Sequence, residues 1–208
     1  MSKRILVLAP HTDDAEIGCG GTIAKYIEQG HEVFYLVFSA AEESVPAGFP
    51  KDTLRYEVML AASELGVKKE NIALFSYKVR YFTYSRQDIL EDMVKFKKEI
   101  APDLVLLPSR NDIHQDHHTI TTEGIRAYKS SSILGYELPW NNLSFQSHCF
   151  NSLEEVHLQK KIDAINCYKT QQGRQYTNPK FIKSWAIMRG TQSQNKLAES
   201  FEVIKWNL

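Results

Sequence analysis

The 208-residue sequence predicts an α/β fold, arranged as a single domain with a mostly parallel sheet and helices on both faces. Short apolar runs alternate with longer segments whose apolar residues recur at helical spacing. Repeated strand–helix units of this kind join parallel strands through helices that cover both faces of the sheet. Hydrophobic residues make up 43% of the chain, enough for a sizeable core, and no repeat or linker divides it.

The first two strands and the helix between them are the clearest elements. Residues 4–10 (RILVLAP) form a continuous apolar run, which is typical of a strand buried on both faces. Residues 15–29 have helical periodicity and are followed by Gly30, a residue type that commonly ends a helix. Residues 31–39 (HEVFYLVFS) predict the second strand.

Two further strand–helix units follow. Thr53 can cap a helix that ends at Gly66. Residues 71–77 (NIALFSY) predict a third strand, and residues 88–101 predict a third helix. Residues 102–109 (PDLVLLPS) then predict a fourth strand, so that four strands and three helices alternate in the first half of the chain.

The remaining sequence is less regular. Beyond Ile120 we expect a helix that runs to Lys129, and then a strand near SILGYEL. A further helix is predicted from Ser152 to about Lys169. A polar stretch and a final strand near ESFEVIKW complete the prediction.

Charge and cysteine content exclude several classes of protein. Lysine and arginine (25) balance aspartate and glutamate (25) and no basic run is present, so we expect no binding of nucleic acid or of an anionic membrane. No run approaches the roughly 20 apolar residues of a membrane span, and the apolar run at the N-terminus is too short for a signal peptide. The three cysteines are too few for a disulfide framework. These features favour a cytoplasmic protein.

Two loops rich in histidine and aspartate follow the first and fourth predicted strands. One reads PHTDD and the other SRNDIHQDHH. Ligands of open parallel sheets collect outside the carboxyl ends of the strands, so these distant loops can meet in space. Histidine and carboxylate side chains bind zinc, and catalytic zinc sites use three protein ligands. The loops therefore predict a metal site at this edge of the sheet.

The glycine run behind the first loop leaves a second interpretation open. Gly18, Gly20 and Gly21 suggest a nucleotide-binding turn, and hence a nucleotide- or cofactor-binding protein without hydrolase activity. The dinucleotide fingerprint, however, places G-x-G-x-x-G directly after the strand, whereas this run starts later and lacks the third spacing. Packing offers a simpler explanation, because glycine lets a helix lie close to the sheet.

The same motifs resemble those of a known family. The stretch P-H-T-D-D-A-E-I-G-C-G-G is similar to the first signature of the PIG-L/LmbE family of zinc-dependent N-deacetylases, and N-D-I-H-Q-D-H is similar to the second. The resemblance covers essentially residues 1–208. It implies a Rossmann-like sheet that binds no Rossmann cofactor. It also implies a hydrolase that removes the N-acetyl group from an N-acetylglucosamine-type sugar, whether a sugar conjugate, a sugar nucleotide or a glycan precursor.

The resemblance implies a metal and its ligands. His11 and Asp14 from the first motif and His117 from the second correspond to the ligands of the family. His118 is an alternative to His117 that the sequence leaves open. The implied ion is Zn²⁺, and Fe²⁺ suits the same ligands. Either ion is a Lewis acid, which helps the hydrolysis of an unreactive amide.

Three further residues acquire chemical roles from the resemblance. Asp13 corresponds to the general base that takes a proton from the attacking water. His114 corresponds to the histidine that stabilises the oxyanion or protonates the leaving amine. Asp116 would orient His114 through a hydrogen bond that fixes its tautomer.

The two candidate substrate-binding residues, Arg55 and Asp112, each have two possible roles. Arg55 resembles a family position that contacts polar or charged parts of the substrate, although a solvated charge on a helix would have the same pattern. Asp112 is expected either to bind substrate hydroxyls or to cap the helix that begins near Gln115. The predicted partner is a small N-acetylated sugar, and assembly into a homo-oligomer stays open.

Overall fold

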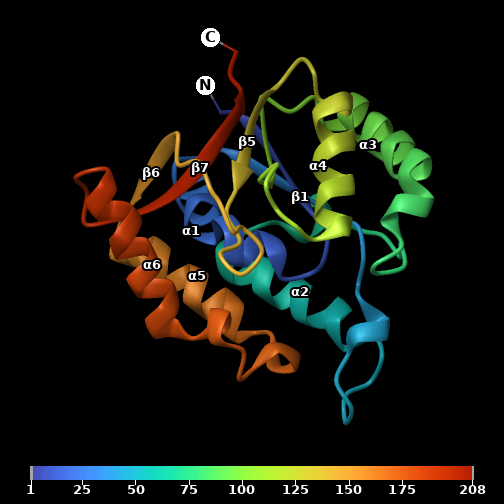
Figure 1. Cartoon of the computed structure of the whole chain (residues 1–208), viewed down its shortest axis with the longest axis horizontal. Helices are drawn as coiled ribbons and strands as arrows, with labels where there is room; N and C mark the ends of the chain where they lie inside the picture. Colours follow the sequence, from blue (N-terminus) through green and yellow to red (C-terminus); the bar gives the residue numbers. More distant parts are fainter. Residues whose placement is uncertain (1, 208) are drawn as a thin grey trace.

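The computed structural model describes residues 2–207, which form one seven-stranded sheet in the order β3-β2-β1-β4-β5-β7-β6 (Figure 1). Strands β1 to β5 are mutually parallel, and β7 joins the edge of β5 in the antiparallel direction and pairs with β6. The mostly parallel sheet is therefore confirmed. The strand bounds are β1 Arg4–Ala9, β2 Glu32–Val37, β3 Ile72–Leu74, β4 Leu104–Pro108, β5 Ser132–Tyr136, β6 Cys149–Leu153 and β7 Leu197–Lys205.

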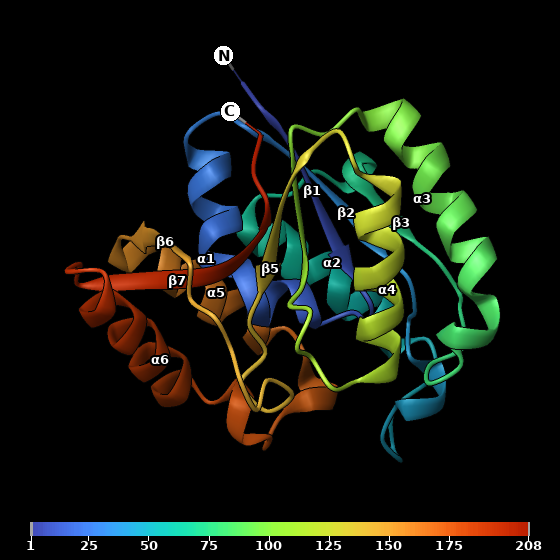
Figure 2. The same cartoon turned by 45° about the horizontal axis from the view of Figure 1, so that its top comes forward.

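Helices cover both faces of the sheet, as the sequence predicts. Alternate residues of β1 point to opposite faces: Ile5 and Val7 pack under α1, α2, α5 and α6, whereas Leu6 and Leu8 pack under α3 and α4. Figure 2 shows α3 and α4 together on one side of the sheet. Among residues 2–207, no helix has the length and apolar character that crossing a membrane requires. The helix bounds are α1 Asp14–Glu28, α2 Thr53–Leu65, α3 Arg86–Ile100, α4 Gln115–Ala127, α5 Glu155–Asn166 and α6 Pro179–Gln192.

Several element boundaries differ from the sequence prediction. Strand β3 covers only Ile72–Leu74 of the predicted range 71–77, and α4 begins at Gln115 and not beyond Ile120. Two further differences concern the starts of α5 and α2. Ser152 lies in strand β6, and helix α5 begins only at Glu155. The strand was missed because it is a short, half-buried edge strand with polar residues, held by β7 alone. Thr53 is the first residue of α2 and does not cap it, since its hydroxyl donates to the Pro50 carbonyl (2.7 Å).

Helix α6 lies in the stretch that the sequence analysis treated as merely polar. Its start has a recognisable signal, because the Asn178 side chain accepts a hydrogen bond from the Lys180 amide and Pro179 occupies the first turn. Ile182, Trp185 and Ala186 are the residues it buries against the core. The narrow apolar stripe was hidden by charged and polar neighbours, so periodicity alone did not reveal the helix.

Helix α1 is broken at Cys19, whose backbone is not helical (φ −148°, ψ 23°). The second half of the helix therefore has free amides, and the buried Glu199 carboxylate on β7 accepts hydrogen bonds from Gly21 (3.1 Å) and Thr22 (2.7 Å). Lys161 on α5 pairs with the same carboxylate at 2.6 Å. Glu199, to which the sequence assigns no role, thus holds the break in α1 in place.

The glycines of α1 allow close packing, as the sequence analysis expects. A Cβ atom at Gly18 would collide with the ring of Tyr136 on β5, and one at Gly21 would lie 2.5 Å from Leu153 Cδ1. The Tyr136 hydroxyl donates to the Leu8 carbonyl (3.0 Å), so the ring cannot move aside easily. This contact leaves the first half of α1 directly against the sheet.

We expect Gly18→Ala to lower the free energy of unfolding by about 1–3 kcal/mol, because the added methyl group overpacks a pinned aromatic ring. Gly20→Ala is the matched control, because its Cβ would come no closer than 3.1 Å to another atom (Lys161 Cγ), whereas the Cβ at Gly18 would lie 2.8 Å from Tyr136 Cγ and closer still to Tyr136 Cδ2. Urea denaturation of the two variants measures the difference. Equal stabilities would show that the glycine run does not set the distance between α1 and the sheet.

Candidate functional site

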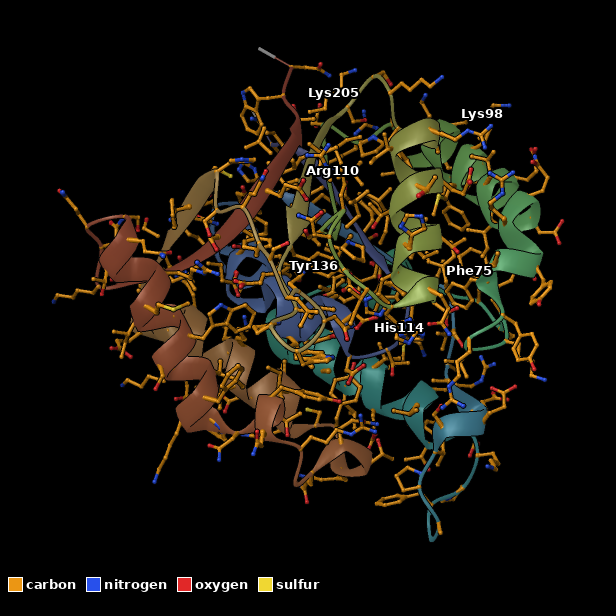
Figure 3. The ribbon with its side chains drawn as sticks, in the orientation of Figure 1. Phe75, Lys98, Arg110, His114, Tyr136 and Lys205 are labelled. Carbon is orange, nitrogen blue, oxygen red and sulfur yellow. The ribbon has the colours of Figure 1, made fainter. Side chains whose placement is uncertain are left out.

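The two motif loops leave neighbouring strands at the same edge of the sheet. Strands β1 and β4 are adjacent and parallel, with Ile5 opposite Leu104. The segment after β1 carries His11 and leads into α1, and the segment after β4 carries His114 and leads into α4. Figure 3 labels His114 at the beginning of α4. The sequence-based expectation that these distant loops meet is therefore confirmed.

Three donor atoms converge between the loops. His11 Nδ1, Asp14 Oδ2 and His117 Nε2 lie 3.2 Å from one another in all three pairs. Ligands bound at about 2.0–2.2 Å to a tetrahedral ion are about 3.3 Å apart or slightly more, so the three atoms have the spacing of one face of such a site. His114 lies next to this triad, and its ligand atom is within 4.8 Å of those of His11 and His117.

The ring nitrogens of His11 and His117 that face away from the triad each contact a carboxylate. His11 Nε2 lies 3.0 Å from Asp116 Oδ2, and His117 Nδ1 lies 2.7 Å from Asp112 Oδ2. Hydrogen bonds at these atoms place the proton on the outer nitrogen and leave the inner nitrogen free to bind a metal. With a metal at the inner nitrogens, both rings would therefore keep their remaining proton on the outer nitrogen, beside the carboxylate.

The electrostatics of the cluster favour a cation. Burial alone would lower the pKa of His117, but Asp14 and Asp112 outweigh it and raise that pKa to about 10. Burial likewise opposes ionisation of Asp14, yet His117 and His11 keep the pKa of this carboxyl well below its usual range. Buried carboxylates therefore hold protons on buried imidazoles. A divalent cation among the three donor atoms would replace those protons, so the residues fit a metal.

Asp116 has a different partner from the one that the sequence analysis expects. Its carboxylate contacts the His11 ring and does not orient His114. The same fully buried carboxylate also accepts the backbone N–H groups of Arg80 (2.5 Å) and Phe82 (3.3 Å). Asp116 thus ties the segment after β3 to the triad, an arrangement that spacing along the chain does not reveal.

Asp112 is also placed differently from both of its expected roles. One oxygen contacts His117 Nδ1, and the other accepts the backbone N–H of His114 at 2.8 Å. The side chain is buried, so it does not offer an oxygen to a substrate hydroxyl. The helix α4 does begin at Gln115, but its N-cap is His114.

His114 is fixed by the backbone of its own helix. Its Nδ1 accepts the Asp116 backbone N–H at 3.2 Å, which leaves the proton of the neutral ring on Nε2. Burial, together with the nearby His117 and His11, lowers the pKa of His114 to about 4. The ring is therefore neutral at pH 7. Of its two expected roles, this geometry supports donation of the Nε2 hydrogen to an oxyanion.

Asp13 stands at the N-terminus of α1 without capping it. Burial and the neighbouring Asp14 carboxylate raise the pKa of Asp13 to about 6. This side chain lines a cavity of about 290 Å³ together with the triad and His114. A carboxylate in this position can take a proton from a water molecule beside the three donor atoms.

Arg55 does not line this cavity. Its guanidinium pairs with Glu42 (2.7 Å) and donates to Ser76 (2.7 Å) in a neighbouring depression. The cavity wall also contains four large side chains that the sequence pattern does not single out, because they come from segments without regular periodicity: Arg80, Trp140, Arg174 and Tyr176. For Arg80 the local signal is its place three residues after the end of the predicted strand 71–77.

Solved structures share this fold. The N,N'-diacetylchitobiose deacetylase from Pyrococcus horikoshii superposes with a TM-score of 0.82 at 22% identity, covering 98% of this chain and 84% of that one. The 4-carboxy-2-hydroxymuconate hydratase GalB from Pseudomonas putida has a TM-score of 0.80 at 22% identity, covering 99% and 98%. Since one is a deacetylase and the other a hydratase, the common fold alone does not define a reaction.

Sequence comparisons identify the family. The uncharacterized deacetylase YaiS of Escherichia coli is 26% identical over 173 residues, which are 81% of this chain and 91% of that protein. The diacetylchitobiose deacetylase of Thermococcus kodakarensis is 32% identical over 133 residues, which are 60% of this chain and 49% of that protein. The model of the PIG-L family, GlcNAc-PI de-N-acetylase, matches residues 6–128, a segment that contains both motif loops. The chain therefore belongs to the PIG-L family of deacetylases.

Proposed function

We propose that this protein is a metal-dependent hydrolase that removes the N-acetyl group from an N-acetylglucosamine-type amino sugar. The observation that carries the proposal is the 3.2 Å spacing of the His11, Asp14 and His117 donor atoms, with Asp13 beside them in one cavity. Zn²⁺ is the ion we assign to these residues, and Fe²⁺ is the alternative.

The residues around the triad supply the remaining chemistry of amide hydrolysis. A bound ion would act as a Lewis acid toward the amide carbonyl and toward water. The carboxylates that line the cavity are those of Asp13 and Asp14. Because Asp14 belongs to the triad, the Asp13 carboxylate takes the proton of the attacking water. The His114 ring donates its Nε2 hydrogen to the oxygen that becomes negatively charged.

The choice of an acetylated sugar rests on the relatives and on the cavity. The relatives from Thermococcus kodakarensis and Pyrococcus horikoshii are named diacetylchitobiose deacetylases, and the family description names an N-acetylglucosamine conjugate. The aromatic rings of Trp140 and Tyr176 line the same cavity and stack on each other at 3.9 Å. Rings of this kind offer an apolar face to a sugar.

The alternative of a nucleotide-binding protein has less support. Gly18, Gly20 and Gly21 are buried, and they face Tyr136, Lys161 and Leu153. Their backbone is therefore covered by protein side chains, whereas a phosphate-binding turn presents its amides to the ligand.

Metal analysis combined with acetate release tests the function. Purified protein is expected to hold about one zinc or iron per chain and to release acetate from N-acetylglucosamine, diacetylchitobiose or UDP-N-acetylglucosamine. Treatment with EDTA should abolish the release, and added Zn²⁺ or Fe²⁺ should restore it. A metal-free protein that binds nucleotides tightly and releases no acetate from this panel would favour the alternative.

A further inference from the structure

In the described part of the chain, most arginines pair with a carboxylate, but two arginines at the candidate site do not. The chain contains eight arginines. Within residues 2–207, five of them pair with a carboxylate: Arg55, Arg86, Arg110, Arg126 and Arg189. Of the other three, Arg80 and Arg174 both line the cavity beside the triad, and Arg4 lies at the start of β1.

The backbone of Arg80 is held in an unfavourable conformation at this place. Its φ of +70° is left-handed, which costs free energy for a residue with a side chain. The conformation is maintained by the Arg80 N–H, which donates to Asp116 Oδ2, the oxygen that also contacts His11. Within residues 2–207, the Arg80 side chain donates one hydrogen bond, to the Ser44 hydroxyl at 3.4 Å. The carboxylate that contacts a triad histidine therefore also fixes the backbone position from which the Arg80 side chain extends along the cavity wall.

Arg174 is placed by the aromatic wall of the cavity. Its Nη1 donates to the Tyr176 hydroxyl (2.5 Å), and the Tyr176 ring stacks on Trp140. Arg174 belongs to the segment between α5 and α6, whereas Arg80 follows β3. Two separate parts of the chain therefore each bring one guanidinium to the cavity.

We infer that Arg80 and Arg174 bind an anionic group of the substrate, so that the preferred substrate is an N-acetylated amino sugar carrying a phosphate or a carboxylate. This inference rests on the proposed function and narrows its substrate class. Guanidinium groups form paired, charge-assisted hydrogen bonds with both kinds of anion. Arg55, the arginine that the sequence analysis selects for such a contact, already pairs with Glu42 outside the cavity.

Matched neutral and anionic substrates test the inference. N-acetylglucosamine is compared with its 1-phosphate, its 6-phosphate, its UDP conjugate and N-acetylmuramic acid, using kcat/KM for acetate release. At least one anionic substrate should exceed the neutral sugar by about tenfold or more, the equivalent of one charge-assisted hydrogen bond. Arg80→Ala and Arg174→Ala should each reduce this anionic-to-neutral ratio by about tenfold, and Arg80→Lys should restore part of it. The phosphate and carboxylate substrates show which anion is preferred.

Arg4→Ala is the matched control, because Arg4 is an exposed arginine at the opposite end of β1 whose guanidinium pairs with no carboxylate of residues 2–207. It should leave the ratio unchanged. An unchanged ratio in Arg80→Ala and Arg174→Ala, or a wild-type protein that prefers the neutral sugar, would overturn the inference while the proposed function stands. Absence of acetate release from every sugar, neutral ones included, would instead remove the proposed function and the inference with it.

Discussion

Replacing Asp13 by Asn is expected to lower kcat by about 10²–10⁴ while the protein keeps its metal. The amide is nearly isosteric with the carboxylate but cannot accept the proton of the attacking water. Asp13 contributes none of the three donor atoms that are spaced at 3.2 Å. Removing its charge therefore leaves all three donor atoms of the metal site in place. Metal content by mass spectrometry, measured beside kcat for acetate release, separates the two effects.

A nearby acid that does not line the cavity provides the control for this change. Glu43 is exposed in the segment after β2 and lies outside the cavity wall, so Glu43→Gln should retain wild-type kcat and metal content. Full activity in Asp13→Asn would rule out Asp13 as the base. Loss of the metal together with activity would show that Asp13, although outside the triad, is needed to hold the ion.

The sequence predicts the part of the site that depends on local order and strand direction. The loops PHTDD and HQDH each follow an apolar run, and parallel strands bring their carboxyl ends to one edge. His11, Asp14 and His117 therefore converge as the motif suggests. The alternation of strands and helices brings the two loops together, and the resemblance to the family selects these three residues from the other histidines and aspartates of the loops.

The remaining contacts depend on three-dimensional packing that the sequence pattern does not contain. Asp116 is two residues from His114, which makes it an obvious partner in sequence, yet the turn at the start of α4 directs its carboxylate to His11. Arg80 lies in an irregular segment whose backbone N–H groups donate to the Asp116 carboxylate, and Arg174 lies in another irregular segment, where its side chain donates to Tyr176. Periodicity describes faces of helices and strands, so it does not report where such segments end up.

The revised placement of Asp116 leads to the second large effect. Asp112→Asn and Asp116→Asn are each expected to weaken metal binding by about 10–100-fold, because each removes the charge that fixes a ligand histidine. Activity should fall at low zinc and recover when excess Zn²⁺ is added. His117→Ala removes a donor atom outright, and its activity should not recover under the same conditions. Competition with a calibrated chelator measures the affinities.

The outcome distinguishes the two roles available to Asp116. If its carboxylate served His114, Asp116→Asn would bind metal as tightly as the wild type, and kcat would stay low at every zinc concentration. Asp103→Asn is the control, since the Asp103 carboxylate accepts the Arg4 amide (2.8 Å) at the other end of the sheet and should not affect the metal. Weaker binding in both Asp112→Asn and Asp116→Asn, but not in Asp103→Asn, would support two carboxylates that each hold one histidine for the ion.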